Sequence, residues 1–379
     1  MFNKFIKQLY NNINNYNNSW NQVYNNLNVK SINFTNEHLE NIPNINNYDT
    51  DILHNIKGYN KQLLKFCFYT PNRKININAI NCNNNLDVYQ IKHNFKLIYI
   101  WFHIIEKFTN IECSQNLNIY LFYTPLLKLL PINKGDPIST YNANTAFTFS
   151  CNINNYIHIF RSEEWFKVLI HECFHCLGLD FSNVNYEYNN TILSLFPLNL
   201  NFKIYESYCE FWAVIINSIF YCFYNYNHNT NFLKNFENII NNEINFSLFQ
   251  CNKILIHFNM NYSNFFNNDK KSINIRLNNY KENTPIFAYF FIKTILLYFY
   301  KDFLKWCFKN NDNNNPLLFN KNITNINAFI KFIEIKYKNI TFINKINNYY
   351  QTYYNNYDIN NIYNLINLRM TITDIHDYY

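Results

Sequence analysis

RSEEWFKVLIHECFHCLGLD, residues 161–180, is the stretch that most constrains the fold, because it predicts a helix with a polar pattern on one face. Ser162 is expected to cap this helix, with Glu163 and Glu164 in its first turn, where acidic side chains interact favourably with the helix dipole. We expect the helix to run from Glu163 to the residue before Gly178. Glycine readily adopts the left-handed backbone that ends helices.

Two histidines lie four residues apart on this helix, and an acid follows the first of them. Residues i and i+4 share one face of a helix, so His171 and His175 can bind a single ion. Zinc suits imidazole ligands, and Glu172 can lie beside the metal without binding it. The pattern therefore predicts one Zn²⁺ per chain, with Glu172 as the general base that takes a proton from a zinc-activated water. The alternative is a pair of buried, hydrogen-bonded histidines without a metal.

A third ligand is expected from the downstream stretch YESYCEFWA, residues 205–213. Glu206 and Glu210 are four residues apart and share one face of a predicted helix. Two carboxylates on an otherwise apolar helix are costly unless they are paired or bound to metal. Asp180 is an alternative metal ligand, since it lies shortly after the second histidine and could reach back around Gly178.

The HExxH motif followed by a helix with two acids four residues apart resembles the gluzincin group of zinc metallopeptidases. The resemblance implies hydrolysis of peptide bonds, with His171, His175 and Glu206 as metal ligands and Glu172 as catalytic base. It also implies that Glu210 accepts a ring N–H from one of the histidines. The group has Asp where this chain has Glu210, so the roles of the two glutamates could be exchanged. Motifs and composition together also resemble uncharacterised HExxH proteins of giant DNA viruses.

Two further elements of a peptidase site are assigned by role. An edge strand that binds the substrate backbone is expected at Thr145, Ala146 and Phe147, although an ordinary strand of the sheet is an equal alternative. A side chain that stabilises the tetrahedral intermediate is also needed. The candidates for it are Tyr208, His257 and Tyr289.

The cysteines indicate a reducing compartment. The chain has 10 of them, and its N-terminus, MFNKFIKQ, is interrupted by lysines and lacks the apolar run of a secretory signal. We therefore expect reduced thiols and an intracellular location, in a host cytoplasm or a virion if the protein is viral. Cys173 and Cys176 lie on the motif helix, where packing is a better explanation than metal binding or redox chemistry.

The order of predicted elements indicates an α+β fold. A zincin-like arrangement is expected, in which a small mixed sheet with a backing helix and the HExxH helix lies over a mainly helical lower lobe. Alternating apolar residues predict strands, and longer apolar stretches predict helices. The strands are expected at 73–80, 116–123, 145–151 and 156–160. The other helices are expected at 95–108, 204–223, 232–242, 248–258 and 285–308.

Four regions follow from this order. They are a helical N-terminal region (1–72), an upper lobe with the sheet and the HExxH helix (73–180), a helical lower lobe that supplies the third ligand (181–310), and an Asn-rich, partly helical C-terminal region (311–379).

Charge and hydropathy exclude some classes of partner. The net charge is +7, but the lysines are scattered and form no basic patch, so we expect no specific nucleic-acid partner. No apolar stretch is long enough for a membrane span. A polypeptide substrate is the expected partner. The alternatives are a catalytically inactive zincin-fold protein with a structural or interaction role, and a zinc hydrolase that acts on a non-peptide amide.

Overall fold

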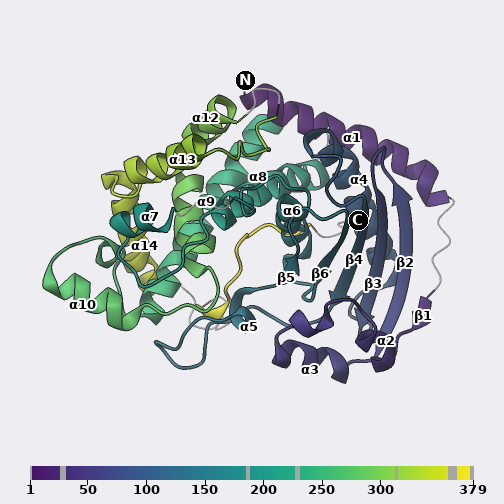
Figure 1. Ribbon diagram of the computed structural model, residues 1–379, viewed down its shortest axis with the longest axis horizontal. Helices are drawn as coiled ribbons and strands as arrows, with labels where there is room; N and C mark the ends of the chain where they lie inside the picture. The colour runs from purple at the N-terminus through teal and green to yellow at the C-terminus, as the bar shows by residue number, and fades with distance from the viewer. Residues whose placement is uncertain are drawn as a thin grey trace.

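A mixed sheet forms one side of the molecule and a bundle of helices forms the other (Figure 1). The structure is a computed structural model that describes residues 2–25, 31–184, 188–226, 231–311, 315–356 and 365–375. Parts of the predicted regions 1–72, 181–310 and 311–379 thus lie outside the described residues. The prediction of an α+β class with a mixed sheet is confirmed.

The sheet has six strands in the order β1-β2-β3-β4-β6-β5. Its central strands β3, β4 and β6 are parallel, whereas β1, β2 and β5 run antiparallel to their neighbours. Strand β5 ends the order and is therefore an edge strand. Alternation explains the central strands, because Ile75 and Ile77 of β3 enter the core while Asn76 between them faces the other side. The strands are β1 (Ser31–Asn33), β2 (Lys61–Tyr69), β3 (Lys74–Cys82), β4 (Asn116–Tyr123), β5 (Ala146–Thr148) and β6 (Asn154–Ile159).

Helices cover both faces of the sheet. One face carries the main core, which is continuous with the helical side of the molecule. Short helices enclose a smaller core on the opposite face. The helices beside the main core are α1 (Phe2–Asn25), α4 (Val88–Ile105), η2 (Glu106–Phe108) and α6 (Trp165–Cys176), and those beside the smaller core are α2 (Asn36–Glu40), η1 (Ile45–Asn47) and α3 (Thr50–Gly58).

The helical side is built around α8 (Tyr205–Asn225), which packs against α6, α9 and a π-helical segment, η4. Helix α1 contacts both α4 and α8 and so spans the two sides of the molecule (Figure 1). The remaining elements are α5 (Thr140–Ala143), α7 (Asn189–Leu195), α9 (Phe232–His257), η3 (Tyr262–Phe265), α10 (Lys270–Asn279), η4 (Phe287–Ile292), α11 (Lys293–Tyr298), α12 (Tyr300–Asn310), α13 (Ile323–Lys336) and α14 (Ile340–Asn356).

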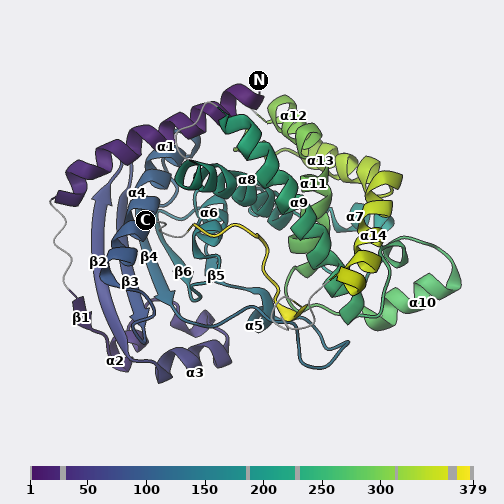
Figure 2. The ribbon, with the colours of Figure 1, turned by 180° about the vertical axis from the view of Figure 1, so that it is seen from behind.

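A C-terminal segment, residues 365–375, crosses between the sheet and the helical side (Figure 2). Side chains satisfy much of its buried backbone. Glu164, just before α6, accepts the backbone N–H groups of Met370 and Thr371, at 2.7 and 2.6 Å. Lys293, at the start of α11, donates to the carbonyl of Met370 at 2.9 Å. The segment therefore links the helix that carries the HExxH motif to the helical side.

Several predicted elements are confirmed and others are wrong. The strands at 73–80 and 116–123 and the helices at 95–108 and 204–223 are present as β3, β4, α4 with η2, and α8. The region 1–72 is not purely helical, since β1 and β2 lie within it; the adjacent Leu63 and Leu64 interrupt the alternation of β2. The helices expected at 232–242 and 248–258 are one helix, α9, because the polar Glu243 between them faces the core. The stretch 285–308 is divided into η4, α11 and α12.

The prediction that all thiols are reduced is wrong for one pair. Cys113 and Cys151 form a disulfide, and the other eight cysteines are free. Asn116 of β4 lies opposite Asn154 of β6, and each cysteine precedes its asparagine by three residues. Parallel pairing of two strands thus brings together cysteines that are distant in sequence. Within the described ranges, no helix has the length and apolar character needed to cross a membrane.

Candidate metal centre

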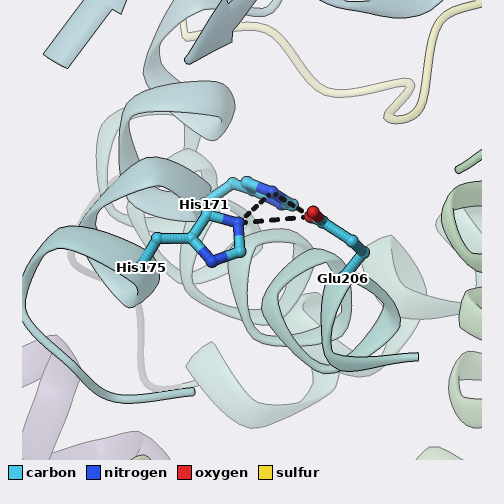
Figure 3. Close-up of side chains that lie close together, drawn as sticks. All are labelled: His171, His175 and Glu206. Atoms are coloured by element: carbon cyan, nitrogen blue, oxygen red, sulfur yellow. Dashed lines mark hydrogen bonds and ion pairs between the residues drawn. The ribbon is translucent and has the colours of Figure 1, made fainter. Parts of the chain in front are cut away.

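Helices α6 and α8 bring three potential ligand atoms to one point (Figure 3). His171 Nε2 lies 3.1 Å from Glu206 Oε2 and 3.1 Å from His175 Nε2, and His175 Nε2 lies 3.2 Å from Glu206 Oε2. In tetrahedral zinc sites with bonds of about 2.0 Å, neighbouring ligand atoms are about 3.3 Å apart. The three atoms therefore have the spacing of one face of a zinc tetrahedron.

The other ring nitrogens of the two histidines face carboxylates. His175 Nδ1 lies 2.7 Å from Asp180 Oδ2. His171 Nδ1 lies 2.9 Å from Glu210 Oε1, at an angle outside that of a regular hydrogen bond. A carboxylate at Nδ1 favours a proton on that nitrogen and leaves the Nε2 lone pair for a metal. Two such lone pairs and a carboxylate oxygen directed at one point repel one another unless protons or a metal cation lie between them. Two imidazoles and a carboxylate at this spacing fit a zinc ion.

The two helices meet through a row of alternating basic and acidic side chains. Lys167, His171 and His175 follow one another at intervals of four on α6, and Glu206 and Glu210 do so on α8. Glu206 lies between the two histidines, whereas Glu210 lies between His171 and Lys167. Intervals of four keep each set on one helix face, so each contact between the two sets places a basic group against an acid.

Burial and neighbouring charges shift the pKa values of this cluster. Burial acts to raise the pKa of Glu206, but the two histidines outweigh it and lower the pKa to about 2. Burial acts to lower the pKa of His175, but the neighbouring carboxylates of Glu206 and Asp180 raise it well above its ordinary value. The pKa of Glu172 is raised, chiefly by burial. The cluster thus holds cations strongly, and protons and a metal ion would compete for it.

Glu172 opens onto a small cavity beside His171. The cavity measures about 30 Å³, which is room for one or two water molecules. The residues that line it are Lys128, Ala143, Asn144, Thr145, Ala146, Lys167, Val168, His171, Glu172, Glu210, Tyr289 and Met370. The hydroxyl of Thr145 is buried and has no hydrogen-bond partner among the residues that the structure describes. A water molecule in this cavity would have polar neighbours on several sides.

The expected substrate strand is only partly directed at the site. Thr145 precedes β5 and Ala146 begins it, and both line the cavity. Phe147 points to the other face, where its ring stacks on His158 with centroids 4.6 Å apart and contacts Tyr48. The Phe147 side chain therefore faces away from the cavity, because successive side chains of a strand face opposite ways. Binding of a substrate backbone along this edge strand stays a prediction.

One of the three candidate electrophiles lies at the cavity. Tyr289, on η4, lines it, and its ring centroid is 6.0 Å from that of His171. Tyr208 is wrong for this role, since it is fully buried and its hydroxyl donates to the carbonyls of Pro316 and Leu317. His257 is also wrong, because it lies at the end of α9, where Nε2 contacts the carbonyl of Asp136 at 2.8 Å.

Asp180 lies on the Nδ1 side of His175, away from the three Nε2 and Oε2 atoms. It forms a second potential ligand set with His175 and Cys209. The Cys209 thiol lies 3.8 Å from His175 Nδ1, and burial raises its pKa, which disfavours the thiolate that a metal requires. Asp180 is therefore better placed to orient His175 than to bind a metal.

The start of α6 differs from its prediction. The helix begins at Trp165, and Glu164 precedes it with a left-handed backbone, φ 57°, and no side-chain cap. Glu163 and Glu164 are buried instead of lying in the first turn: Glu163 accepts the backbone N–H of Lys128, and Glu164 accepts its ammonium group. Pairing with Lys128 takes both acids into the core, so the assignment of Ser162 as the cap is wrong.

The end of α6 follows its prediction. Gly178 has φ 69°, and its N–H donates to the carbonyl of His175 at 3.1 Å. The backbone N–H of Cys151, in the disulfide, contacts the same carbonyl at 3.3 Å. Cys173 and Cys176 are fully buried in the core, which agrees with a packing role.

Sequence reasoning missed two side chains beside this centre. Lys167 precedes His171 by four residues, and this spacing could have identified it. Tyr205 precedes Glu206 directly, and its ring lies 5.9 Å from that of His175. No pattern in the sequence distinguishes this tyrosine from the 32 others.

Comparison of the chain with models of protein families, with curated proteins and with solved structures finds no match.

Proposed function

We propose that the protein is a zinc-dependent hydrolase that cleaves peptide bonds. The observation that carries this proposal is the convergence of His171 Nε2, His175 Nε2 and Glu206 Oε2 at 3.1 to 3.2 Å, next to Glu172. Two imidazoles and one carboxylate are the protein ligands of one class of catalytic zinc site, which leaves a position open for water or substrate.

Each residue then has a role. The imidazoles of His171 and His175 and the carboxylate of Glu206 hold the metal, and Glu210 and Asp180 orient the two histidines. When bound, a zinc ion supplies a Lewis acid and lowers the pKa of the water that it holds. Glu172 takes a proton from the attacking water and returns it to the leaving amine.

Two elements at the cavity suit a peptide substrate. Strand β5 is the last strand of the sheet, so its outer edge can pair with an extended chain beside Thr145 and Ala146. Tyr289 also lines the cavity, where a phenol can donate a hydrogen bond to the oxygen that becomes negative during attack. A cavity of about 30 Å³ has room for water but not for a side chain of a peptide, so a substrate would lie across its opening.

The same small cavity favours a second candidate, a zinc site that stabilises the fold of a structural or interaction protein. Such a site would hold the metal without turnover. Hydrolysis of a non-peptide amide is a third candidate, which substrate profiling separates from peptide cleavage.

Zinc content and cleavage of a peptide library test these alternatives together. We would purify the untagged protein, measure zinc by elemental analysis, and identify cleaved peptides by mass spectrometry. A peptidase should contain about one zinc per chain, and Glu172→Gln should keep the metal but lose about 100- to 10,000-fold in activity. Glu112→Gln, an exposed control, should retain both. Zinc without cleavage would favour the structural role, and an active Glu172→Gln protein would exclude the proposed base.

A further inference from the structure

The row of basic and acidic side chains between α6 and α8 ends in a buried ion pair of Lys167 and Glu210. Lys167 Nζ lies 2.7 Å from Glu210 Oε1 and 2.8 Å from Glu210 Oε2. The exposed fractions of the two side chains are 1% and 3%. The ammonium group also lies 3.8 Å from Met370 Sδ, a poor acceptor, so Glu210 is its main partner. Separation of this pair would leave a buried charge without compensation.

Lys167 makes the surroundings of two otherwise equivalent glutamates different. Glu206 and Glu210 are one turn apart on α8, and each contacts a histidine of α6. Glu206 has histidines on both sides, so one of its oxygens reaches both Nε2 atoms. Both oxygens of Glu210 are held by the ammonium group, and its remaining contact is with His171 Nδ1.

Lys293 is also positively charged and lies nearby, but its ammonium group does not hold the Glu210 carboxylate. Its Nζ donates to Ser247 Oγ at 3.2 Å and to the carbonyl of Met370 at 2.9 Å, and so it helps to hold the C-terminal segment. Among the described residues, Lys167 is the ammonium group in direct contact with Glu210. Its position on α6, one turn before His171, fixes the carboxylate against the ring nitrogen that faces away from Glu206 and His175.

We propose that Lys167 is a positioning residue that assigns the two glutamates their roles, since it holds Glu210 against His171 Nδ1 and so leaves metal ligation to Glu206. This inference rests on the zinc site of the proposed function. It predicts that the coordination of the metal depends on a side chain that does not touch it. The ion pair acts as a clamp, because a carboxylate held at both oxygens cannot rotate toward the Nε2 atoms.

A double-mutant cycle on the full chain tests the clamp. Lys167→Met removes the charge and keeps most of the length of the side chain, and Glu210→Gln neutralises the partner. We would measure zinc affinity by competition with a chelator, and the absorption spectrum of the Co²⁺-substituted protein, which reports coordination geometry. Lys167→Met should weaken zinc binding about 10- to 100-fold and change the Co²⁺ spectrum. In the Glu210→Gln background the same substitution should not weaken zinc binding further.

The controls separate this inference from the proposed function. Lys301→Met removes an exposed lysine that also pairs with a glutamate, Glu237, and should leave zinc affinity unchanged. If Lys167→Met alone does not fold, Lys167→Arg provides the comparison, because it keeps the charge but alters the contact; partial retention of zinc affinity is expected. If Lys167→Met lowered zinc affinity equally in the wild-type and the Glu210→Gln backgrounds, the proposed positioning role of Lys167 would be overturned. A wild-type protein that binds no zinc would instead overturn the proposed function.

Discussion

Asp180 Oδ2 lies 2.7 Å from Nδ1 of His175, across the turn that ends α6. The aspartate is almost fully buried, and Ser182 Oγ donates to its other oxygen at 3.0 Å. The helix that carries His175 thus ends in a turn that returns a carboxylate to the same ring. Hydrogen bonds of this kind fix the ring orientation and the tautomer of metal-binding histidines.

Asp180→Ala should therefore weaken zinc binding without abolishing it. Loss of the acceptor at His175 Nδ1 should raise the dissociation constant about 10- to 100-fold, as measured by chelator competition. The protein should still take up zinc at saturating concentrations. Asp51→Ala, at an exposed position of α3, is the control and should bind zinc as the wild type does. Complete loss of zinc at saturation would show instead that Asp180 is a ligand.

Gly178→Ala should destabilise the protein, because this turn requires a left-handed backbone. The residue has φ 69°, and an added Cβ would lie 3.1 Å from Cys113 Sγ. We expect the free energy of unfolding in urea to fall by about 1–2 kcal/mol. Gly58→Ala is the matched control, since nothing lies within 4 Å of its added Cβ at the end of α3. It should be neutral or slightly stabilising. Equal effects of the two substitutions would contradict this view of the turn.

Glu243→Ala should be among the most destabilising substitutions on α9. Its buried carboxylate accepts hydrogen bonds from Thr371 Oγ at 2.5 Å, from Thr373 Oγ at 2.7 Å, and from the backbone N–H groups of Ile372 and Thr373 at 3.2 Å. Removal of the acceptor leaves these buried donors unpaired, at a cost of about 3 kcal/mol or more in the free energy of unfolding.

Glu237→Ala provides the control for Glu243→Ala on the same helix. The Glu237 side chain is 48% exposed and pairs with Lys301 at the surface. Its loss should change stability by less than about 0.5 kcal/mol in the same urea titration. A small effect of Glu243→Ala would mean that the C-terminal segment does not depend on this carboxylate for its position.

Glu282 should make the protein less stable as the pH rises. Burial raises the pKa of this carboxyl to about 7, although hydrogen bonds from Tyr280 OH and the backbone N–H of Phe287 oppose the shift. Between about pH 4.5 and 7 the folded state then binds a proton that the unfolded state has lost, so this contribution falls as the pH increases. The total loss is on the order of 3 kcal/mol and is nearly complete by about pH 8.

Glu282→Gln should remove this dependence, because the amide stays neutral and its oxygen still accepts the two hydrogen bonds. The variant should be more stable than the wild type at pH 8 and similar to it at pH 4.5, as measured by urea unfolding at the two values. Glu112→Gln, at an exposed position, should follow the wild type. An unchanged pH dependence of stability in Glu282→Gln would show that the Glu282 carboxyl has its ordinary pKa in the folded state.

Local spacing was sufficient to predict several parts of the fold and of the candidate site. The interval between His171 and His175 placed both on one helix face, and Gly178 marked the end of that helix. The same reasoning placed Glu206 and Glu210 on one face of α8. These features depend on backbone periodicity and on the conformational freedom of glycine. Both are local properties that a short stretch of sequence determines.

Contacts between distant segments could not be predicted in this way. The approach of α6 to α8 placed Glu206 between two histidines and gave Glu210 to Lys167. Parallel pairing of β4 with β6 joined Cys113 to Cys151, although neither cysteine carries a local signal of its partner.

The sequence by itself therefore determined which residues share a helix face and where the strands β3 and β4 and the helices α4 and α8 run. Only the tertiary structure decided which faces of the helices and of the sheet pack against one another. It excluded Tyr208 and His257 from the cavity, kept Tyr289 there, and placed the C-terminal segment between the two sides of the molecule. The physical reason is that periodicity is a property of one segment, whereas pairing of buried charges and packing of side chains depend on the complementarity of two segments that fold together.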